Sequence, residues 1–355
     1  SYSLGKLADW LGTRSPHAHR ALADCEMLTG VWRLALAGLS TIDPAVLNTI
    51  LKLQSRYYFD ESEWIERVLE ASGSKANAFS LKALRRLQTS DEAKEAKLDA
   101  FEQRLKYENK QKLHSYFEEI AAHEAAFERR ASQEQMSAAV YQTFEGAQCM
   151  VAEAPTGVGK SLAYLMPSVL LAKENDITVG IATKTNALAD QLISSEIPRL
   201  QKRLEKLGKP EANFSFAAVK GYENYFCMRK VDRLLRSKSE VPSALEHVLS
   251  WISQSPEGDL SRFSGNIFSA RAELVANQAE CTKRRCPFYA QQCYIHAARA
   301  KAKAADIVIT NHSLLLRDSL SAAKVLPPIR YWIVDEAHSF EGETRRQTES
   351  VLMVM

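Results

Sequence analysis

Two hallmarks of membrane and secreted proteins are missing from this sequence. No apolar run approaches the roughly 18 residues of a membrane helix, and the longest, from Leu162 to Ala172, predicts a buried helix. The 355 residues hold only six cysteines and show no export signal, whereas disulfide frameworks belong to short, cysteine-dense secreted chains. Because the sequence begins at Ser1 without a methionine, the cysteine usage carries this inference. We expect a cytoplasmic protein with no membrane partner.

A strong net charge is also missing, because 46 Lys and Arg against 43 Asp and Glu leave a formal charge of +3. The net charge therefore gives no indication of a nucleic-acid partner. The basic residues are unevenly distributed, however, since residues 281–303 contain six Lys or Arg and no acidic residue. Such a local patch fits a nucleic-acid contact, and it fits an ordinary solvated face equally well.

Glycine and proline are absent from residues 74–145. Residues 81–130 are rich in Ala, Leu, Glu, Lys, Gln and Arg, which are strong helix formers. Asp43 followed by Pro44 is a favourable N-cap and first-turn pair for a helix. We therefore expect a first segment over residues 1–40 and a helical connector over 41–130, both mainly α-helical.

After Gly146 the sequence alternates between helical stretches and short apolar runs. Continuous runs of this kind, rather than alternating ones, suit strands that are buried on both faces of a parallel sheet. The predicted fold of residues 131–355 is therefore α/β and doubly wound. The runs are residues 149–154, 177–183, 306–310 and 331–337.

The first apolar run leads into EAPTGVGKS, residues 153–161, which has the spacing of a phosphate-binding loop with Ala154 in place of the usual first glycine. The two glycines would let successive N–H groups point inward, and a helix that starts near Lys160 would add its positive end. In such loops the lysine reaches the β and γ phosphates, and the next hydroxyl binds Mg2+. The predicted nucleotide contacts are Thr156, Gly157, Val158, Gly159, Lys160 and Ser161.

A nucleotide loop needs a second, acidic site, and WIVDEAH at residues 332–338 supplies one at the end of an apolar run. Asp335 would hold the Mg2+ through water, and Glu336 would orient or deprotonate the attacking water. His338 would sense the γ phosphate. A lone Asp-Glu pair also occurs in solvated turns, but the loop upstream favours a catalytic set of Lys160, Asp335, Glu336 and His338.

Other motifs fall into the order of a known family. RASQEQM at residues 130–136 is followed by APTGVGKS, TKTNALADQL, KGYENYFCMRK, TNHSLLLRD and DEAH. Over roughly residues 125–345 the chain thus resembles the superfamily 2 DNA helicases of the DinG and XPD type, which have a RecA-like P-loop domain. The resemblance implies that Gln133 contacts the adenine base. It also implies that the segment from Thr183 to Leu192 grips the DNA backbone, with contacts from Thr183, Lys184 and Gln191.

The same resemblance gives the cysteines a role. In this family four cysteines, one early and three later, bind a 4Fe-4S cluster between the first two ATPase motifs, in an insertion that here would span about residues 220–300. Thiolates are the normal ligands of iron-sulfur clusters, but four of them also make a closed zinc site. Gaps of 53, 4 and 6 residues differ from the paired C-x2-C pattern of structural zinc and favour iron-sulfur. The matching residues are Cys227, Cys281, Cys286 and Cys293, while Cys25 and Cys149 are expected to be buried.

The basic patch lies around these cysteines. Lys283, Arg284 and Arg285 would hold DNA phosphates near the cluster. The rings of Phe288, Tyr289 and Tyr294 would either stack on bases or pack against the cluster. The resemblance implies an ATP-dependent helicase of DNA repair or replication, nucleoid-associated in a bacterial cytoplasm, which moves 5′ to 3′ on single-stranded DNA and acts on branched DNA or RNA–DNA structures. Its cofactors would be ATP, Mg2+ and the 4Fe-4S cluster.

The first residues resemble a different family. HRALADC, with His19 and Asp24, looks like the last motif of the DEDDh, DnaQ-like exonucleases, in which the His is a general base and the Asp holds a metal. Two-metal hydrolysis needs further carboxylates from an earlier D-x-E strand, and none precedes Ser1. A capped surface helix explains the same residues. We expect residues 1–355 to lack nuclease activity.

The second RecA-like domain of the helicase family, which supplies an arginine finger, has no counterpart in this sequence. Without that arginine, phosphoryl transfer loses roughly three to five orders of magnitude in rate, so we expect nucleotide and DNA binding with little turnover. Two other functions stay open at this point. One is a metal-supported clamp for single-stranded DNA with a vestigial ATP site, and the other is a redox sensor that uses the cluster to switch DNA affinity.

Overall fold

The computed structural model describes residues 3–16, 21–54, 62–73, 81, 104–108, 110–155, 157–237, 244–255, 257–321 and 324–352. The chain divides into two compact units. Unit 1 comprises residues 1–86 and 226–275, and unit 2 comprises residues 87–225 and 276–355. Both unit boundaries at 225 and 275 fall inside the segment 220–300 that the sequence predicts as an insertion. The domain boundaries predicted at residues 40 and 130 remain predictions.

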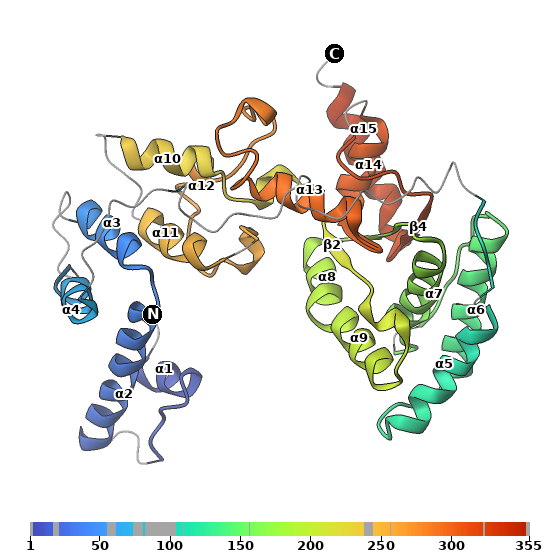
Figure 1. The fold of residues 1–355 in the computed structure, drawn as a ribbon, viewed down its shortest axis with the longest axis horizontal. Helices are drawn as coiled ribbons and strands as arrows, with labels where there is room; N and C mark the ends of the chain where they lie inside the picture. Colours follow the sequence, from blue (N-terminus) through green and yellow to red (C-terminus); the bar gives the residue numbers. More distant parts are fainter. Residues whose placement is uncertain are drawn as a thin grey trace. The chain divides into compact units, whose positions relative to one another are not determined.

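The regular elements in the described part of unit 1 are helices, apart from one β-bridge between Phe226 and Val275 (Figure 1). Asp43 caps one of its helices as predicted, because the N–H of Ala45 donates to Asp43 Oδ1 over 2.7 Å and Pro44 takes the first helical position. The α-helices are α1 (Leu4–Trp10), α2 (Ala21–Ser40), α3 (Pro44–Gln54), α4 (Ser62–Ser72), α10 (Met228–Arg236), α11 (Ala244–Gln254) and α12 (Arg271–Leu274), with a 3-10 turn, η5 (Leu260–Arg262).

Aromatic packing holds residues 226–275 together. Phe226 lies 5.5 Å from the ring centroid of Trp251 and 5.2 Å from that of Phe263, and its backbone pairs with Val275. The side-chain amide of Gln54 on α3 donates to Glu246 on α11 over 3.0 Å, so an N-terminal helix and a helix of the later segment share this unit.

Helix α2 is apolar in sequence but buries little of its surface. Ala23 and Met27 are buried, while Leu22, Leu28, Trp32 and Leu34 are exposed. Cys25 is exposed as well, so the expectation of a buried thiol there is wrong. Among the described helices none alone has the length and apolarity to cross a membrane, and only α2 and α3 taken together, across a 108° bend, reach that threshold.

Unit 2 is built around a parallel sheet of four strands in the order β2-β3-β1-β4. This mixed α/β arrangement around a parallel sheet confirms the predicted fold class. Three of the four predicted strands are present. The strands are β1 (Val179–Thr183), β2 (Phe216–Ala218), β3 (Ile307–Asn311) and β4 (Tyr331–Val334).

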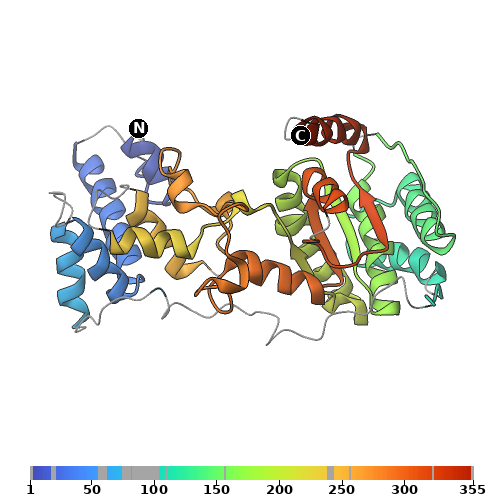
Figure 2. The ribbon, with the colours of Figure 1, turned by 90° about the horizontal axis from the view of Figure 1, so that it is seen from above.

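Helices surround this sheet. In Figure 2 the teal helices α5 and α6 lie beside α7, and α6 packs directly on α7. The α-helices are α5 (Lys110–His123), α6 (Ala131–Glu145), α7 (Lys160–Asn175), α8 (Asn186–Gln191), α9 (Ile197–Lys206), α13 (Tyr294–Ala304), α14 (His312–Leu320) and α15 (Phe340–Leu352). Short elements are the π-helical turn η2 (Leu192–Glu196) and the 3-10 turns η3 (Pro210–Asn213), η4 (Tyr222–Asn224), η6 (Lys283–Arg285) and η7 (Ala337–Ser339).

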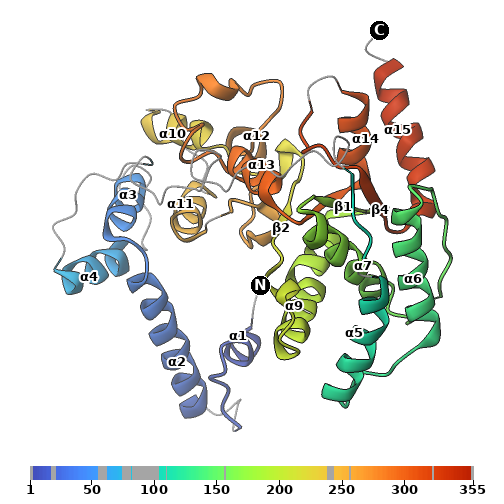
Figure 3. The ribbon, with the colours of Figure 1, turned by 45° about the vertical axis from the view of Figure 1, so that its right-hand side comes forward.

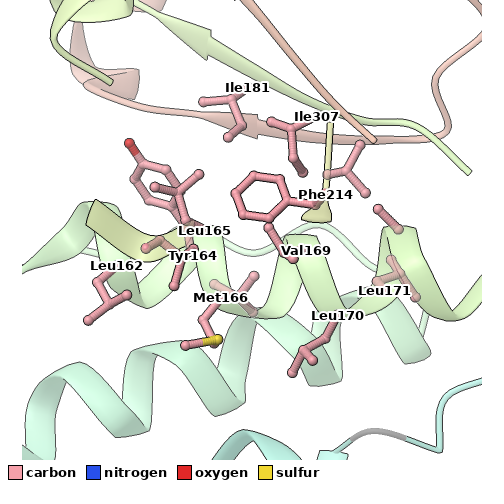
Figure 4. Close-up of a cluster of buried hydrophobic side chains, with 14 of the residues drawn as sticks. Leu162, Tyr164, Leu165, Met166, Val169, Leu170, Leu171, Ile181, Phe214 and Ile307 are labelled. Atoms are coloured by element: carbon pink, nitrogen blue, oxygen red, sulfur yellow. The ribbon is translucent and has the colours of Figure 1, made fainter. Parts of the chain in front are cut away.

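Both faces of the sheet are covered, as a doubly wound fold requires. Ile307 and Ile309 of β3 belong to a core with α7 and α9, whereas Val308 between them belongs to a second core with α13 and α14. These four helices are labelled around the sheet in Figure 3. Every residue of α7 from Leu162 to Ala172 is buried, which confirms the helix predicted from the longest apolar run. Figure 4 shows α7 side chains meeting Ile181, Ile307 and Phe214 in the larger core.

The strand predicted at residues 149–154 is not formed. Residues 148–155 carry no regular secondary structure, Val151 is 92% exposed, and Cys149 is exposed rather than buried as expected. This run contains a single β-branched residue, Val151, whereas the run at 306–310 has four. The weaker β propensity of the run, together with the left-handed turn at Ala147 that precedes it, accounts for the difference.

Candidate nucleotide site and cysteine segment

The phosphate-loop sequence adopts the curled backbone that its glycines predict. Gly157 and Gly159 have φ angles of +87° and +84°, which residues with a Cβ atom rarely adopt. Helix α7 begins at Lys160 with Gly159 as its N-cap, so the free N–H groups of its first turn open toward the loop. Val158 and Ser161 are half-buried beside them, and Thr156 lies outside the described residues. The loop and helix together form a concentration of N–H donors suited to an anion.

Gln133 supports this loop from α6. Its side chain is buried, and its Nε2 donates a hydrogen bond to the carbonyl oxygen of Gly159 over 2.9 Å. A Cβ atom on residue 159 would collide with that amide nitrogen, so glycine is required both for its backbone angle and for this close approach. The contact joins two motifs that stand 26 residues apart in the sequence.

Asp335 and Glu336, the acidic pair, directly follow β4, and the backbone bends at these two residues. The N–H of Asp335 donates to the carbonyl oxygen of Ala182 on β1 over 2.9 Å, and its Oδ1 accepts from the N–H of Glu336 over 3.0 Å. Glu336 has a φ of +56°, an uncommon conformation for a residue with a side chain. This bend lies at the carboxyl end of the sheet, where open α/β sheets bind their ligands.

The loop and the acidic pair meet through their charges. Lys160 Nζ lies 3.6 Å from Glu336 Oε1, and His338 Nδ1 lies 3.5 Å from Glu336 Oε2. The Lys160 and Glu336 side chains are each 33% exposed, so this ion pair itself stabilises the fold little. Its importance is positional, because it brings three of the four predicted catalytic side chains into one place.

Two further residues of this site were not foreseen from the sequence. Tyr164, one turn after Lys160, donates to Asp335 Oδ2 over 3.1 Å, and burial together with the negative charge of Asp335 raises the pKa of its phenol well above the usual value. His312 donates from Nε2 to the carbonyl oxygen of Asp335 over 2.8 Å, and burial lowers the pKa of its imidazole. The histidine of TNHSLLLRD was a sequence signal, but nothing in the sequence pointed to its partner.

The segment predicted to grip DNA begins at the carboxyl end of β1. Thr183 is buried, and its hydroxyl donates to the carbonyl oxygen of Thr185 over 2.9 Å, so its side chain shapes the turn. Lys184 and Gln191 are exposed. The hydroxyl of Thr185 caps α8 by accepting from the N–H of Leu188 over 3.3 Å.

The four cysteines predicted as ligands are all half-buried, and none of the six cysteines, all of which are described, forms a disulfide. Cys227 is the N-cap of α10 in unit 1, and Cys293 is the N-cap of α13 in unit 2. Within the described part of the chain, no three His, Cys, Asp or Glu residues are arranged to hold a metal ion. The cysteines thus match a cluster in their chemistry, as thiol donors, while their arrangement defines no coordination geometry.

The basic residues of this patch are exposed, whereas its aromatic residues are buried or half-buried. Lys283, Arg284 and Arg285 form the exposed turn η6. Phe288 and Tyr294 are buried, so packing rather than base stacking is the role of these two rings. Tyr289 is half-buried and lies edge-on to His296, with ring centroids 4.0 Å apart.

Of the two residues predicted to belong to an exonuclease motif, only Asp24 is among the described residues. Asp24 is half-buried on α2, near the start of that helix. His19 lies outside the described residues, so the pairing of the two side chains stays a prediction.

Comparison with known proteins agrees with this geometry. The family model described as DEAD/DEAH box helicase matches residues 130–239, which include Gln133, the phosphate loop and the segment after β1. The chain is 35% identical over 231 residues to the ATP-dependent helicase DinG of Mycobacterium tuberculosis, a match that covers 59% of this chain and 34% of that protein. Residues 130–239 of this chain are thus similar to DEAD/DEAH box helicases, and the chain is similar to part of a helicase named DinG.

Two other relatives extend the comparison. The ATP-dependent DNA helicase YoaA of Escherichia coli is 33% identical over 222 residues, which cover 60% of this chain and 33% of that protein. A protein of Bacillus subtilis named 3'-5' exonuclease DinG is 26% identical over 354 residues, and that match reaches 96% of this chain and 36% of that protein. The chain therefore spans about a third of the length of the relatives it matches.

Proposed function

We propose that this chain is the nucleotide-binding motor part of an ATP-dependent DNA helicase. The observation that carries the proposal is the convergence of Gln133, Lys160 and Glu336 at one edge of the sheet, by the 2.9 Å and 3.6 Å contacts given above. Three motifs far apart in sequence would not meet by chance at the carboxyl edge of a parallel sheet.

Each residue has a distinct role in the proposed reaction. The backbone from Thr156 to Gly159 cradles the phosphates, and Lys160 neutralises the β and γ phosphates. Ser161 and Asp335 would hold Mg2+, which supplies the charge that stabilises the transferring phosphoryl group. Glu336 orients the attacking water, and His338 lies beside it on the exposed side of the site.

Gln133 would read the base with one end of its amide. Its Nε2 is engaged by Gly159, which leaves Oε1 to accept a hydrogen bond from the exocyclic amino group of adenine. Guanine has a carbonyl oxygen at that position and would meet Oε1 as a second acceptor. The proposal therefore includes a preference for ATP over GTP.

Nucleotide binding can be tested directly on residues 1–355 with a fluorescent, non-hydrolysable ATP analogue in Mg2+. Lys160→Ala should weaken binding at least tenfold, because it removes the positive charge in the loop. Lys173→Ala, at the other end of the same helix, is the matched control and should bind like the parent. Equal affinities for all three proteins would refute the nucleotide site.

We propose that single-stranded DNA contacts Lys184, Gln191 and the turn Lys283–Arg285. The whole protein would move 5′ to 3′ along this strand. Its substrates would be branched DNA or RNA–DNA structures in the nucleoid. Exposure of these side chains supports the proposal, and Thr183 would contribute by shaping the turn beside Lys184. Replacing Lys283, Arg284 and Arg285 by alanine should weaken oligonucleotide binding and flatten its dependence on salt, since each phosphate contact releases counterions. The matched control replaces Arg199, Lys202 and Lys206 of α9 by alanine, which removes the same positive charge. This control should leave the oligonucleotide affinity and its salt dependence unchanged. An equal loss of affinity in the two triple variants would contradict the proposed surface.

We also propose that Cys227, Cys281, Cys286 and Cys293 hold a 4Fe-4S cluster. Four half-buried thiols outside any disulfide support this proposal by their chemistry. The cluster would supply either a structural crosslink or a redox centre. Anaerobically purified protein should be brown and contain iron rather than zinc, and Cys286→Ser should lose both colour and iron while Cys149→Ser keeps them. Stoichiometric zinc without iron would decide for a zinc site.

In the whole protein we propose a second RecA-like domain that supplies an arginine finger. Residues 1–355 should then bind ATP but hydrolyse it roughly 10³ to 10⁵ times more slowly than the whole protein. His19 and Asp24 are proposed to belong to an exonuclease site, a proposal supported by the relative named 3'-5' exonuclease DinG. Because Asp24 is one carboxylate where two-metal hydrolysis needs several, residues 1–355 should not degrade DNA in Mg2+ or Mn2+.

A further inference from the structure

A buried histidine connects the acidic pair to the neighbouring strands. His312, the residue after β3, is 1% exposed and donates to the carbonyl oxygen of Asp335 over 2.8 Å. Its ring lies edge-on to Phe340, with centroids 5.1 Å apart. His312 therefore fixes the backbone at the point where β4 ends and the acidic pair begins.

Three asparagine side chains continue from this histidine in one direction. Asn311, the residue before His312, donates from Nδ2 to Asn186 Oδ1 over 2.7 Å. Asn186 donates from its own Nδ2 to Asn224 Oδ1 over 3.0 Å, and Asn224 donates to the carbonyl oxygen of Gly221 over 3.2 Å. We call His312, Asn311, Asn186 and Asn224 the polar relay. All four lie in unit 2.

The order of donors and acceptors links the three asparagines of the polar relay, and His312 is joined to them through its peptide bond to Asn311. Asn311 Oδ1 is already engaged as the cap of α14, accepting from the N–H of Leu314 over 2.8 Å. Reversing the amide of Asn186 would place oxygen against oxygen at one end and N–H against N–H at the other. Such head-to-tail amides polarise one another and favour a concerted change over independent rotations.

The polar relay joins three functional places. At one end is Asp335 of the proposed Mg2+ site, and in the middle Asn186 begins α8, two residues after Lys184 of the proposed DNA contact. At the other end Asn224 lies three residues before Cys227 in the sequence.

We propose that the polar relay couples nucleotide binding to single-stranded DNA binding, with its four members acting as positioning residues. The proposal rests on the proposed function and adds to it the route by which the two sites sense each other. A nucleotide that shifts the Asp335 bend moves His312 and, through Asn311, the start of α8. Coupling of this kind is reciprocal, so the nucleotide and the DNA must change each other's affinity by the same factor.

The test measures the affinity of residues 1–355 for a fluorescent single-stranded oligonucleotide, with and without Mg2+ and a non-hydrolysable ATP analogue. The ratio of the two dissociation constants is the coupling factor. For the parent protein we expect a factor of at least about fivefold in either direction, the lower range of measured allosteric couplings. In Asn186→Ala the factor should fall to within about twofold of one, while the affinity for each ligand alone changes less.

Two variants keep this test decisive. Asn311→Asp retains an oxygen to cap α14 but loses the donor to Asn186, so it should lose coupling even if Asn186→Ala folds poorly. The double variant should lose no more coupling than either single one, since residues of one chain are not additive. Asn213→Ala, an exposed asparagine of η3 in the same unit, is the matched control and should keep the parental factor.

Each outcome is informative. A parental factor of one, or full coupling retained in Asn186→Ala and Asn311→Asp, would overturn the polar relay while leaving the proposed function in place. Failure of the parent to bind the nucleotide at all, seen in the titration without DNA, would instead overturn the proposed function and the relay with it. A merely structural role predicts lower stability with an unchanged coupling factor.

Discussion

Gln133 of α6 donates from Nε2 to the carbonyl oxygen of Gly159, 2.9 Å away, and thereby fixes the loop residue from which α7 starts. This single contact ties the proposed base-reading residue to the proposed phosphate site. The same amide thus has a structural end and an end left for the nucleotide, and removing it affects both.

Gln133→Ala should weaken binding of an ATP analogue by about threefold to tenfold, the net value of one hydrogen bond. Because Oε1 is proposed to accept from adenine, a GTP analogue should lose less affinity than the ATP analogue. Competition titrations with both analogues measure this. Gln135→Ala, an exposed glutamine on the same helix, should change neither affinity. A uniform loss for both nucleotides would limit Gln133 to bracing the loop.

Gly180→Ala should destabilise unit 2 by about 1–3 kcal/mol, the usual cost of overpacking. Gly180 of β1 pairs with Trp332 of β4, and a Cβ atom there would come within 2.7 Å of the indole Cδ2 and closer still to its six-membered ring. Denaturant unfolding followed by tryptophan fluorescence measures the change. Gly342→Ala in α15, where nothing lies within 4 Å, should be neutral or slightly stabilising. Equal stability of the two variants would show that Trp332 moves aside freely.

The sequence predicted the parts of this fold that depend on local pattern. Ile307, Val308 and Ile309 are consecutive apolar residues, and the structure buries them on alternate faces of the sheet because the β period is two. Gly157 and Gly159 were expected in a curled loop, and both have positive φ angles. In these cases the chemistry of each residue restricts its own conformation, so neighbours need not be known.

The failures concern contacts across space. Tyr164 and His312 reach Asp335 from 171 and 23 residues away, and no spacing in the sequence encodes those distances. Cys25 and Cys149 were expected to be buried from residue type alone, but burial depends on what covers α2 and residues 148–155. A small apolar side chain is compatible with burial without requiring it.

Lowering the pH should weaken the ion pair that attaches α9 to the residue after α5. Arg203 donates to both carboxylate oxygens of Glu124, over 2.7 and 3.0 Å, and these hydrogen bonds lower the pKa of Glu124 below its ordinary value of 4.5. A lowered pKa means that the stabilisation is complete above about pH 4.5 and is lost as pH falls through the pKa of the folded state.

The measurement is the thermal unfolding midpoint between about pH 6 and pH 3 for the parent and Glu124→Gln. The glutamine variant should be less stable at pH 6, and the difference should shrink toward pH 3, because the parent's carboxylate becomes protonated. Glu128→Gln, at a carboxylate that is 74% exposed, should follow the parental curve. Parallel curves for the parent and Glu124→Gln would contradict the assigned pKa direction.

Tyr164→Phe should raise the Mg2+ concentration needed for nucleotide binding. The phenol donates to Asp335 Oδ2, and Oδ1 is held by the N–H of Glu336, so the carboxylate is oriented from both sides. Without the phenol the carboxylate can rotate, and a hydrogen bond to a charged group is typically worth about 1.5–3 kcal/mol, which sets an upper limit of roughly tenfold to a hundredfold. Titrating Mg2+ at fixed ATP analogue measures the shift, and binding in EDTA should be unchanged. Tyr141→Phe removes a comparable phenol bond, 3.0 Å from Glu174 and away from the loop, and should need no additional Mg2+. If the two variants instead required the same Mg2+ as the parent, Tyr164 would serve only to pack α7 under the sheet.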